Sequence, residues 1–132
     1  MSHFHAVVWM DHSEAHVLQF TLDDVERTIV HSKGKHRQVH HRSGKPGSGK
    51  APEDTDYFKS VIDSLERAQQ VLLTGPANEK NEFKKHLDTH AKAVSARIVA
   101  VETSDHPTDG ELLQKARKFF VSSGSLHAAT QS

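Results

Sequence analysis

The sequence contains no cysteine among its 132 residues, which excludes disulfide bonds, thiolate metal sites and cysteine nucleophiles. It has no net formal charge either, because 17 Lys and Arg residues balance 17 Asp and Glu residues, so the whole chain has no field that would attract nucleic acid. The longest apolar runs, Ala6–Met10 and Ile98–Val101, are far too short to span a membrane. The first residues, MSHFHAVVW, lack the basic region and the long apolar stretch of a signal peptide. We therefore expect a soluble, cytoplasmic protein with no membrane partner.

Histidine and local charge are what the sequence has in excess. The chain contains 12 histidines. Its balanced total charge also conceals a separation, because the stretch from His31 to Lys50 holds six Lys and Arg residues and no Asp or Glu. This stretch carries a charge of +6 before any histidine is protonated, and the rest of the chain carries −6. The chain is thus divided into one basic segment and an acidic remainder.

The apolar pattern predicts a single α/β domain over residues 1–121. Apolar or alternating runs bounded by polar turns predict strands, and apolar residues at helical spacing after Pro52, Asn78 and Thr108 predict three helices. The expected strands cover residues 3–10, 15–21, 25–31, 70–75 and 97–102, and the expected helices cover residues 52–68, 78–90 and 108–121.

This order, β-β-β-α-β-α-β-α, predicts one mixed five-stranded sheet with helices packed on it. Short turns join the first three strands into an antiparallel meander, and the two later strands follow helical crossovers. The first strand should therefore be central and paired with both the second and the fourth. Residues 32–51, which are rich in glycine and cations, are expected to form a flexible loop, and residues 122–132 a disordered tail.

Three stretches, taken in order, resemble a known family. A basic, glycine-containing stretch at 31–35 follows the third strand, Tyr57 and Phe58 follow in the next helix, and a strand at 71–75 ends in a small-residue turn that opens a helix with Phe83. Residues 101–110 are similar to the turn that precedes the last helix in the stand-alone bacterial proteins of this family, which are described as translational machinery proteins.

With this spacing the chain resembles the middle domain of archaeal and eukaryotic class-1 peptide-chain release factors and of the ribosome-rescue factor Pelota. The resemblance implies a ribonuclease H-like fold and a basic loop that approaches ribosomal RNA or tRNA. Release factors carry Gly-Gly-Gln at the tip of this loop, whereas this chain has Gly34-Lys35-His36 and a lone Gln38. We therefore do not expect stop-codon-dependent peptide release, and we expect a non-catalytic protein without a cofactor.

The cations of the loop are the strongest functional signal in the residues themselves. Lys and Arg side chains bind phosphates and displace counterions, and histidines add charge below about pH 6.5 and stack on bases. We expect the partner to be the ribosome or a structured RNA such as rRNA or tRNA, and not DNA. The alternative is a solvated linker without a partner. The predicted RNA-binding residues are Lys33, Lys35, His36, Arg37, His40, His41, Arg42, Lys45 and Lys50.

Two other motifs suggest chemistry that their context does not support. The stretch GKPGSGKA at 44–51 is similar to a phosphate-binding P-loop, but Ala51 replaces the Ser or Thr that holds Mg²⁺, and no buried strand precedes it. Histidines with the spacing of metal ligands occur in pairs, without a cysteine or an HExxH motif to complete a site, so we expect polar surface histidines and no metal. These pairs are His3 with His5, and His86 with His90.

A metal-dependent nuclease of ribonuclease H-like form is the alternative from the enzyme class. Such enzymes place a first carboxylate at the end of the central strand, where Asp11 stands, and need three or four converging acids to bind two Mg²⁺ ions. Convergence of Asp11 with Glu66 and Glu102, or with Asp63, would favour this alternative. A tight turn is also a place that Asp favours for structural reasons. A third possibility is a protein-interaction module that binds through its acidic helical body.

Overall fold

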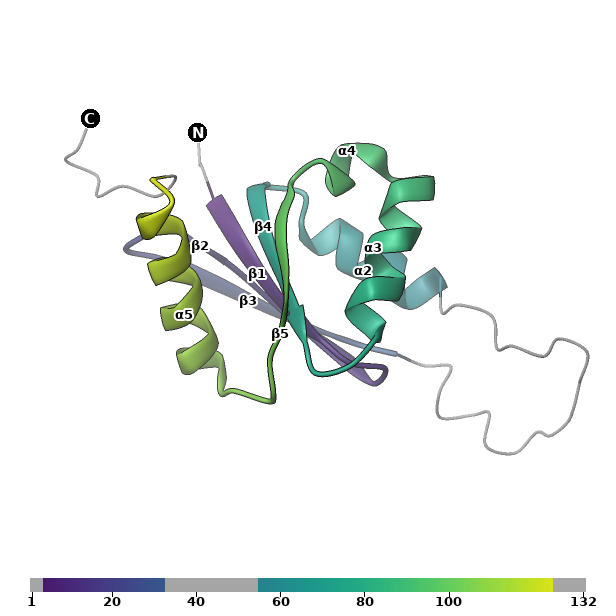
Figure 1. Cartoon of the computed structure of the whole chain (residues 1–132), viewed down its shortest axis with the longest axis horizontal. Helices are drawn as coiled ribbons and strands as arrows, with labels where there is room; N and C mark the ends of the chain where they lie inside the picture. Colours follow the sequence, from purple (N-terminus) through teal and green to yellow (C-terminus); the bar gives the residue numbers. More distant parts are fainter. Residues whose placement is uncertain (1–3, 33–54, 125–132) are drawn as a thin grey trace, which may run out of the picture.

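The structure is a computed structural model of the whole chain, and it describes residues 4–32 and 55–124. The predicted basic loop beyond Ser32 and the predicted tail beyond Gly124 lie outside these residues. One sheet crosses the middle of the domain, with helices on both of its faces (Figure 1). Its strands are β1 (Phe4–Met10), β2 (Glu14–Phe20), β3 (Val25–His31), β4 (Ala68–Gly75) and β5 (Ile98–Thr103). The helices are α2 (Thr55–Ser64), α3 (Glu79–His90), α4 (Lys92–Ser95) and α5 (Asp109–Ser122).

The strands lie in the order β3-β2-β1-β4-β5, so β1 is central, as predicted. β1 pairs antiparallel with β2 and parallel with β4, while β3 and β5 form the two edges. Every residue of β1 is buried, which explains why this strand is an unbroken apolar run rather than an alternating one. The mixed five-stranded α/β sheet predicted from the sequence is therefore confirmed.

The end of β4 approaches β1 so closely that only glycine fits there. A Cβ atom on Gly75 would lie 2.3 Å from the carbonyl oxygen of Met10. One residue earlier, the Thr74 hydroxyl donates a hydrogen bond of 2.9 Å to the carbonyl oxygen of Val8. These contacts join the carboxyl ends of the two central strands.

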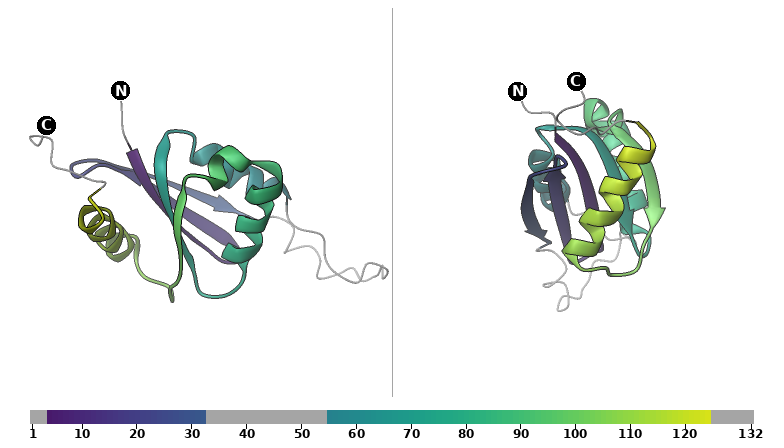
Figure 2. Two further views of the ribbon diagram at one scale, coloured as in Figure 1. Left: turned by 45° about the horizontal axis from the view of Figure 1, so that its top comes forward. Right: turned by 90° about the vertical axis from the view of Figure 1, so that its left-hand side faces the viewer.

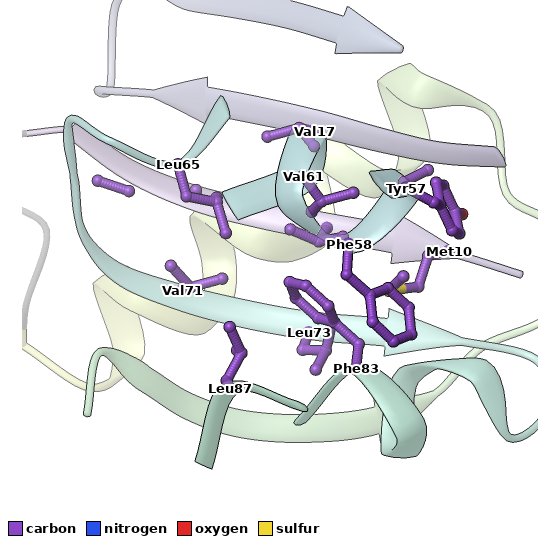
Figure 3. Packing of buried hydrophobic residues seen from close by; sticks show 14 residues of the cluster. Met10, Val17, Tyr57, Phe58, Val61, Leu65, Val71, Leu73, Phe83 and Leu87 are labelled. Carbon is purple, nitrogen blue, oxygen red and sulfur yellow. The ribbon is translucent and has the colours of Figure 1, made fainter. Parts of the chain in front are cut away.

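The larger hydrophobic core lies between the sheet and the helices α2 and α3, on the side where α2 covers β2 and β3 (Figures 2 and 3). The Phe58 ring of α2 meets the Phe83 ring of α3 with centroids 5.3 Å apart, above the sheet residue Leu73. Burial of one such side chain contributes about 1.5–3 kcal/mol. The apolar stripes predicted for these helices therefore do face the core.

Of the helices in the described ranges, α5 is the one that covers the opposite face of the sheet (Figure 2). Leu112, Ala116 and Phe120 are buried against a patch that includes Trp9 and Phe20. The helix starts with the predicted capping box, in which the Thr108 hydroxyl accepts from the Glu111 N–H and the Glu111 carboxylate accepts from the Thr108 N–H.

No helix in the described part of the chain is long and apolar enough to cross a membrane.

The structure corrects the predicted boundaries in three places. The first helix was predicted to run to Ala68, but α2 ends at Ser64 and Ala68 is the first residue of β4. Leu65 and Ala68 are buried as predicted, because tight turns, including a hydrogen bond from the Ala68 N–H to the Leu65 carbonyl, carry them into the core. The short α4 was not predicted because it buries no residue. Ser122, assigned to the tail, is the last residue of α5.

Candidate nucleic-acid interface

The turn between β1 and β2 is built around the side chain of Asp11. Its Oδ1 atom accepts hydrogen bonds from the backbone N–H groups of Ser13, at 2.8 Å, and Glu14, at 3.0 Å. An Asp side chain that bonds to backbone groups two and three residues later is a common way to fix a tight turn. Asp11 is thus engaged in shaping the turn, the structural role that the sequence left open beside metal binding.

This turn also holds the two elements that flank the predicted basic loop. The Ser32 N–H donates to the Ser13 carbonyl oxygen at 2.8 Å, and the Tyr57 hydroxyl donates to the Asp11 carbonyl oxygen at 2.8 Å. Ser32 directly follows β3 and is buried, although the sequence assigned it to the flexible loop. The end of β3 and the beginning of α2 therefore both lie at the end of the sheet where β1 turns into β2 (Figure 1).

The nine residues predicted to bind RNA all belong to the segment 33–50, which lies outside the described residues. None of them is placed by the structure, so their role stays a prediction. His31, the last residue of β3, is described and its side chain is 69% exposed. Its Nδ1 atom is 3.8 Å from Glu14 Oε1, so the strand that leads into the basic segment ends beside a carboxylate.

His16, a histidine that the sequence analysis did not single out, lies near the same end of the sheet, on the face covered by α5. His16 Nδ1 is 2.8 Å from Asp109 Oδ1, and His16 Nε2 is 2.9 Å from Glu14 Oε2. Asp109 also binds Arg27, whose Nη1 atom is 3.0 Å from Asp109 Oδ2. Burial lowers the pKa of His16, but the hydrogen bonds and charges of the two carboxylates outweigh it and raise this pKa above its ordinary value of 6.5.

Trp9 joins this histidine to the connection between β5 and α5. Its indole N–H donates to the Asp105 carbonyl oxygen at 2.6 Å, and its ring packs on His106 with centroids 4.2 Å apart. The ring of His16 meets Trp9 edge-on at 5.9 Å. Trp9 is a core residue, as predicted, and it also orders the approach to α5.

The carboxylates proposed for a nuclease do not converge. Glu66 lies two residues before the start of β4, where Ala68 pairs with Phe4, whereas Asp11 follows the far end of β1. Glu102 is engaged with Lys115 at 3.0 Å. In residues 4–32 and 55–124, no three His, Asp or Glu side chains form a group that could hold a metal ion.

The predicted histidine pairs are also placed by the structure, except for His3, which is outside the described residues. His5 is buried, and its ring packs edge-on against Phe120 at 4.6 Å. His86 and His90 pack on each other, with centroids 4.7 Å apart, next to Phe58. His5 is therefore a core residue, which corrects the expectation of a surface histidine at this position.

Comparison with known proteins finds similarity in structure and not in sequence. No protein-family model matches the chain, and no curated protein matches it. Pelota from Thermoplasma acidophilum is similar with a TM-score of 0.62 and 14% identity, over 93% of this chain and 33% of Pelota. Saccharomyces cerevisiae Dom34, a translation termination-like factor involved in RNA quality control pathways, is similar with a TM-score of 0.54 and 12% identity, over 86% of this chain and 32% of Dom34.

The archaeal translation termination factor aRF1 is similar as well, with a TM-score of 0.52 and 10% identity, over 92% of this chain and 42% of aRF1. At such identities the likeness concerns the fold. The chain has the fold of one part of these translation factors, and it spans about a third of the length of Pelota and Dom34. The resemblance seen in the sequence is confirmed at this level.

Proposed function

We propose that this protein is a non-catalytic RNA- or ribosome-binding protein that acts in translation and contacts rRNA or tRNA through the segment 33–50. The observation that carries the proposal is a run of six cations without one acid, inserted into an otherwise acidic domain whose fold resembles Pelota and aRF1. In this proposal the chain corresponds to the middle domain of those factors and has the ribonuclease H-like form that the family implies.

The anchoring of both flanks supports this role. Ser32 and Tyr57 bond to the same turn, so the last residue described before the segment and the start of the helix after it both lie beside the carboxyl end of β1. Lys and Arg side chains in the segment neutralise phosphates and release condensed counterions, which makes binding depend on salt. The contact is then an electrostatic one, made by a segment rather than by a pocket.

The test is co-sedimentation of the protein with ribosomes over a range of salt concentrations. With three to five phosphate contacts, log affinity should fall linearly with log salt with a slope of about −2 to −3.5, because each contact on a single strand contributes about −0.7. Four alanine substitutions in the segment should weaken binding and flatten this slope, with almost no change in thermal stability. They replace Lys33, Lys35, Arg37 and Arg42.

A second variant with the same loss of charge separates a local contact from a general effect of net charge. It replaces four exposed lysines of the described domain by alanine, and it should keep the slope and nearly all of the affinity. These are Lys59, Lys85, Lys92 and Lys118. Unchanged binding and slope in the segment variant would contradict the proposal. The acidic body would then be the contacting surface, which is the expectation for a protein-interaction module.

A further inference from the structure

His16 stands between two carboxylates that come from different parts of the fold. Glu14 belongs to the same strand, β2, whereas Asp109 is in the first turn of α5, on the other side of the contact between helix and sheet. The two ring nitrogens of His16 lie 2.9 Å and 2.8 Å from oxygens of these carboxylates. The His16 side chain is only 16% exposed, so little water can replace either partner.

This geometry determines the charge of the ring. An ionised carboxylate can only accept a hydrogen bond, and a neutral imidazole has a single N–H to donate. Both short contacts of His16 are hydrogen bonds only if both nitrogens carry a proton, which makes the ring an imidazolium. Bonds between a cation and two anions are shorter and stronger than neutral ones, in keeping with these distances.

We propose that His16 is a proton-operated latch that fastens the start of α5 to β2. With the proton bound, the ring links Glu14 to Asp109. When the proton leaves, one nitrogen presents a lone pair to a carboxylate oxygen, so one of the two bonds is replaced by repulsion. Because α5 is the helix that covers this face of the sheet among the described residues, the protonation of His16 sets how firmly the first turn of α5 is held against β2.

Other charged groups face the latch from each neighbouring element. Arg27 of β3 binds Asp109, and His31 of β3 lies 3.8 Å from Glu14. The His106 ring, from the connection before α5, is 6.3 Å from the His16 ring, and β1 contributes the uncharged Trp9. The Arg27 side chain is 57% exposed and water screens its charge, whereas both carboxylates are partly buried and touch the ring.

The direction of the pH dependence follows from the raised pKa of His16. A histidine whose pKa is higher in the folded than in the unfolded chain contributes stability that is complete below the unfolded value of about 6.5. This contribution is lost as the pH rises through the folded pKa. Because the proton is shared within the set Glu14, His16 and Asp109, the measured titration belongs to the set.

The experiment is an NMR titration of the histidine Cε1–H signals, with His16 assigned from the signal that disappears in His16→Gln. We expect an apparent pKa above 6.5 in the native protein, and a fall in the amide protection factors of Leu112 and Leu113, which are corrected for the intrinsic pH dependence of exchange, as the pH rises through it. Asp109→Asn should lower the apparent pKa of His16 towards 6.5, because it removes one of the two anions and keeps the shape of the side chain. His90→Gln, at an exposed site on α3, should change neither the titration nor the exchange.

Two results would overturn the latch. One is a His16 signal that titrates at or below 6.5 in the native protein. The other is a fall in thermal stability above pH 6.5 that is as steep in His16→Gln as in the native chain. If His16→Gln does not fold, the His16 signal is assigned as the one whose titration shifts in Asp109→Asn, and its apparent pKa in the native protein decides between the outcomes. Glu14, His16 and Asp109 all lie outside the segment 33–50, so the result of this titration does not depend on whether that segment binds RNA.

Discussion

Replacing Gly75 by alanine should be among the most damaging single-methyl changes in this domain. The new Cβ would lie 2.3 Å from the Met10 carbonyl oxygen and 3.4 Å from the Met10 carbonyl carbon. Real Cβ atoms do not approach backbone oxygen so closely, and the atom that must yield belongs to the central strand and not to a flexible side chain. Adding a methyl group to a packed site costs about 1–3 kcal/mol. We expect a loss at the upper end of this range, because two paired strands must separate.

Gly110→Ala is the matched control. Gly110 is in the first turn of α5, and a Cβ there would meet only the Thr108 hydroxyl, at 3.9 Å. Alanine is a better helix former than glycine by about 1 kcal/mol in a helix interior, so this variant should be as stable as the native chain or more stable. The two substitutions add the same methyl group, but only Gly75→Ala should lower the free energy of unfolding.

Urea unfolding followed by tryptophan fluorescence measures both variants, because Trp9 is the single tryptophan and is only 2% exposed. One kcal/mol corresponds to about 4 °C in the melting temperature of a domain of this size. Gly75→Ala should therefore melt roughly 8–12 °C below the native chain. A Gly75→Ala protein with native stability would show that β1 and β4 do not meet as described.

Two further substitutions test the turn between β1 and β2 and the start of α5. Thr108→Ala should destabilise the protein by about 1 kcal/mol in urea unfolding, because it removes the acceptor of the capping box, and Thr108→Ser should restore most of the loss. Equal stabilities of the alanine and serine variants would contradict this. Tyr57→Phe should cost about 0.5–1.5 kcal/mol, because the Asp11 carbonyl oxygen loses its donor while the packing of the ring is kept. A Tyr57→Phe variant as stable as the native chain would show that the packing of the ring, and not the hydrogen bond, is what Tyr57 contributes to stability.

Local patterns predicted the sheet well because they report burial directly. The run Ala6–Met10 reads as a strand covered on both faces, and β1 is the central strand, with a strand on each side and contacts to α3 and α5 on its two faces. The boundary between α2 and β4 was harder, because Leu65 and Ala68 continue the helical spacing while serving the core from a turn and a strand. Burial is visible in the sequence, but the backbone conformation that achieves it is not always.

The site was less predictable because its contacts join distant residues. His16 follows Glu14 by two positions on a strand, which suggests a shared face, but its second partner, Asp109, comes from the start of the last helix. No spacing rule connects a strand residue with a helix residue so far along the chain. Asp11 shows the opposite case, because its position matched a metal site, and the backbone bonds that occupy its carboxylate appear only in the folded turn.

Placing β1 in the middle of the sheet makes burial of the core depend on elements that are synthesised long after this strand. Phe4 pairs with Ala68, so the first strand emerges from the ribosome long before its second neighbour. The face that carries Trp9 and Phe20 is covered only when α5 has been added. A chain that stops before Asp109 would leave that apolar face open to water, and surfaces of this kind bind chaperones or aggregate. Truncation before α5 would therefore favour aggregation or chaperone binding, although it removes no strand.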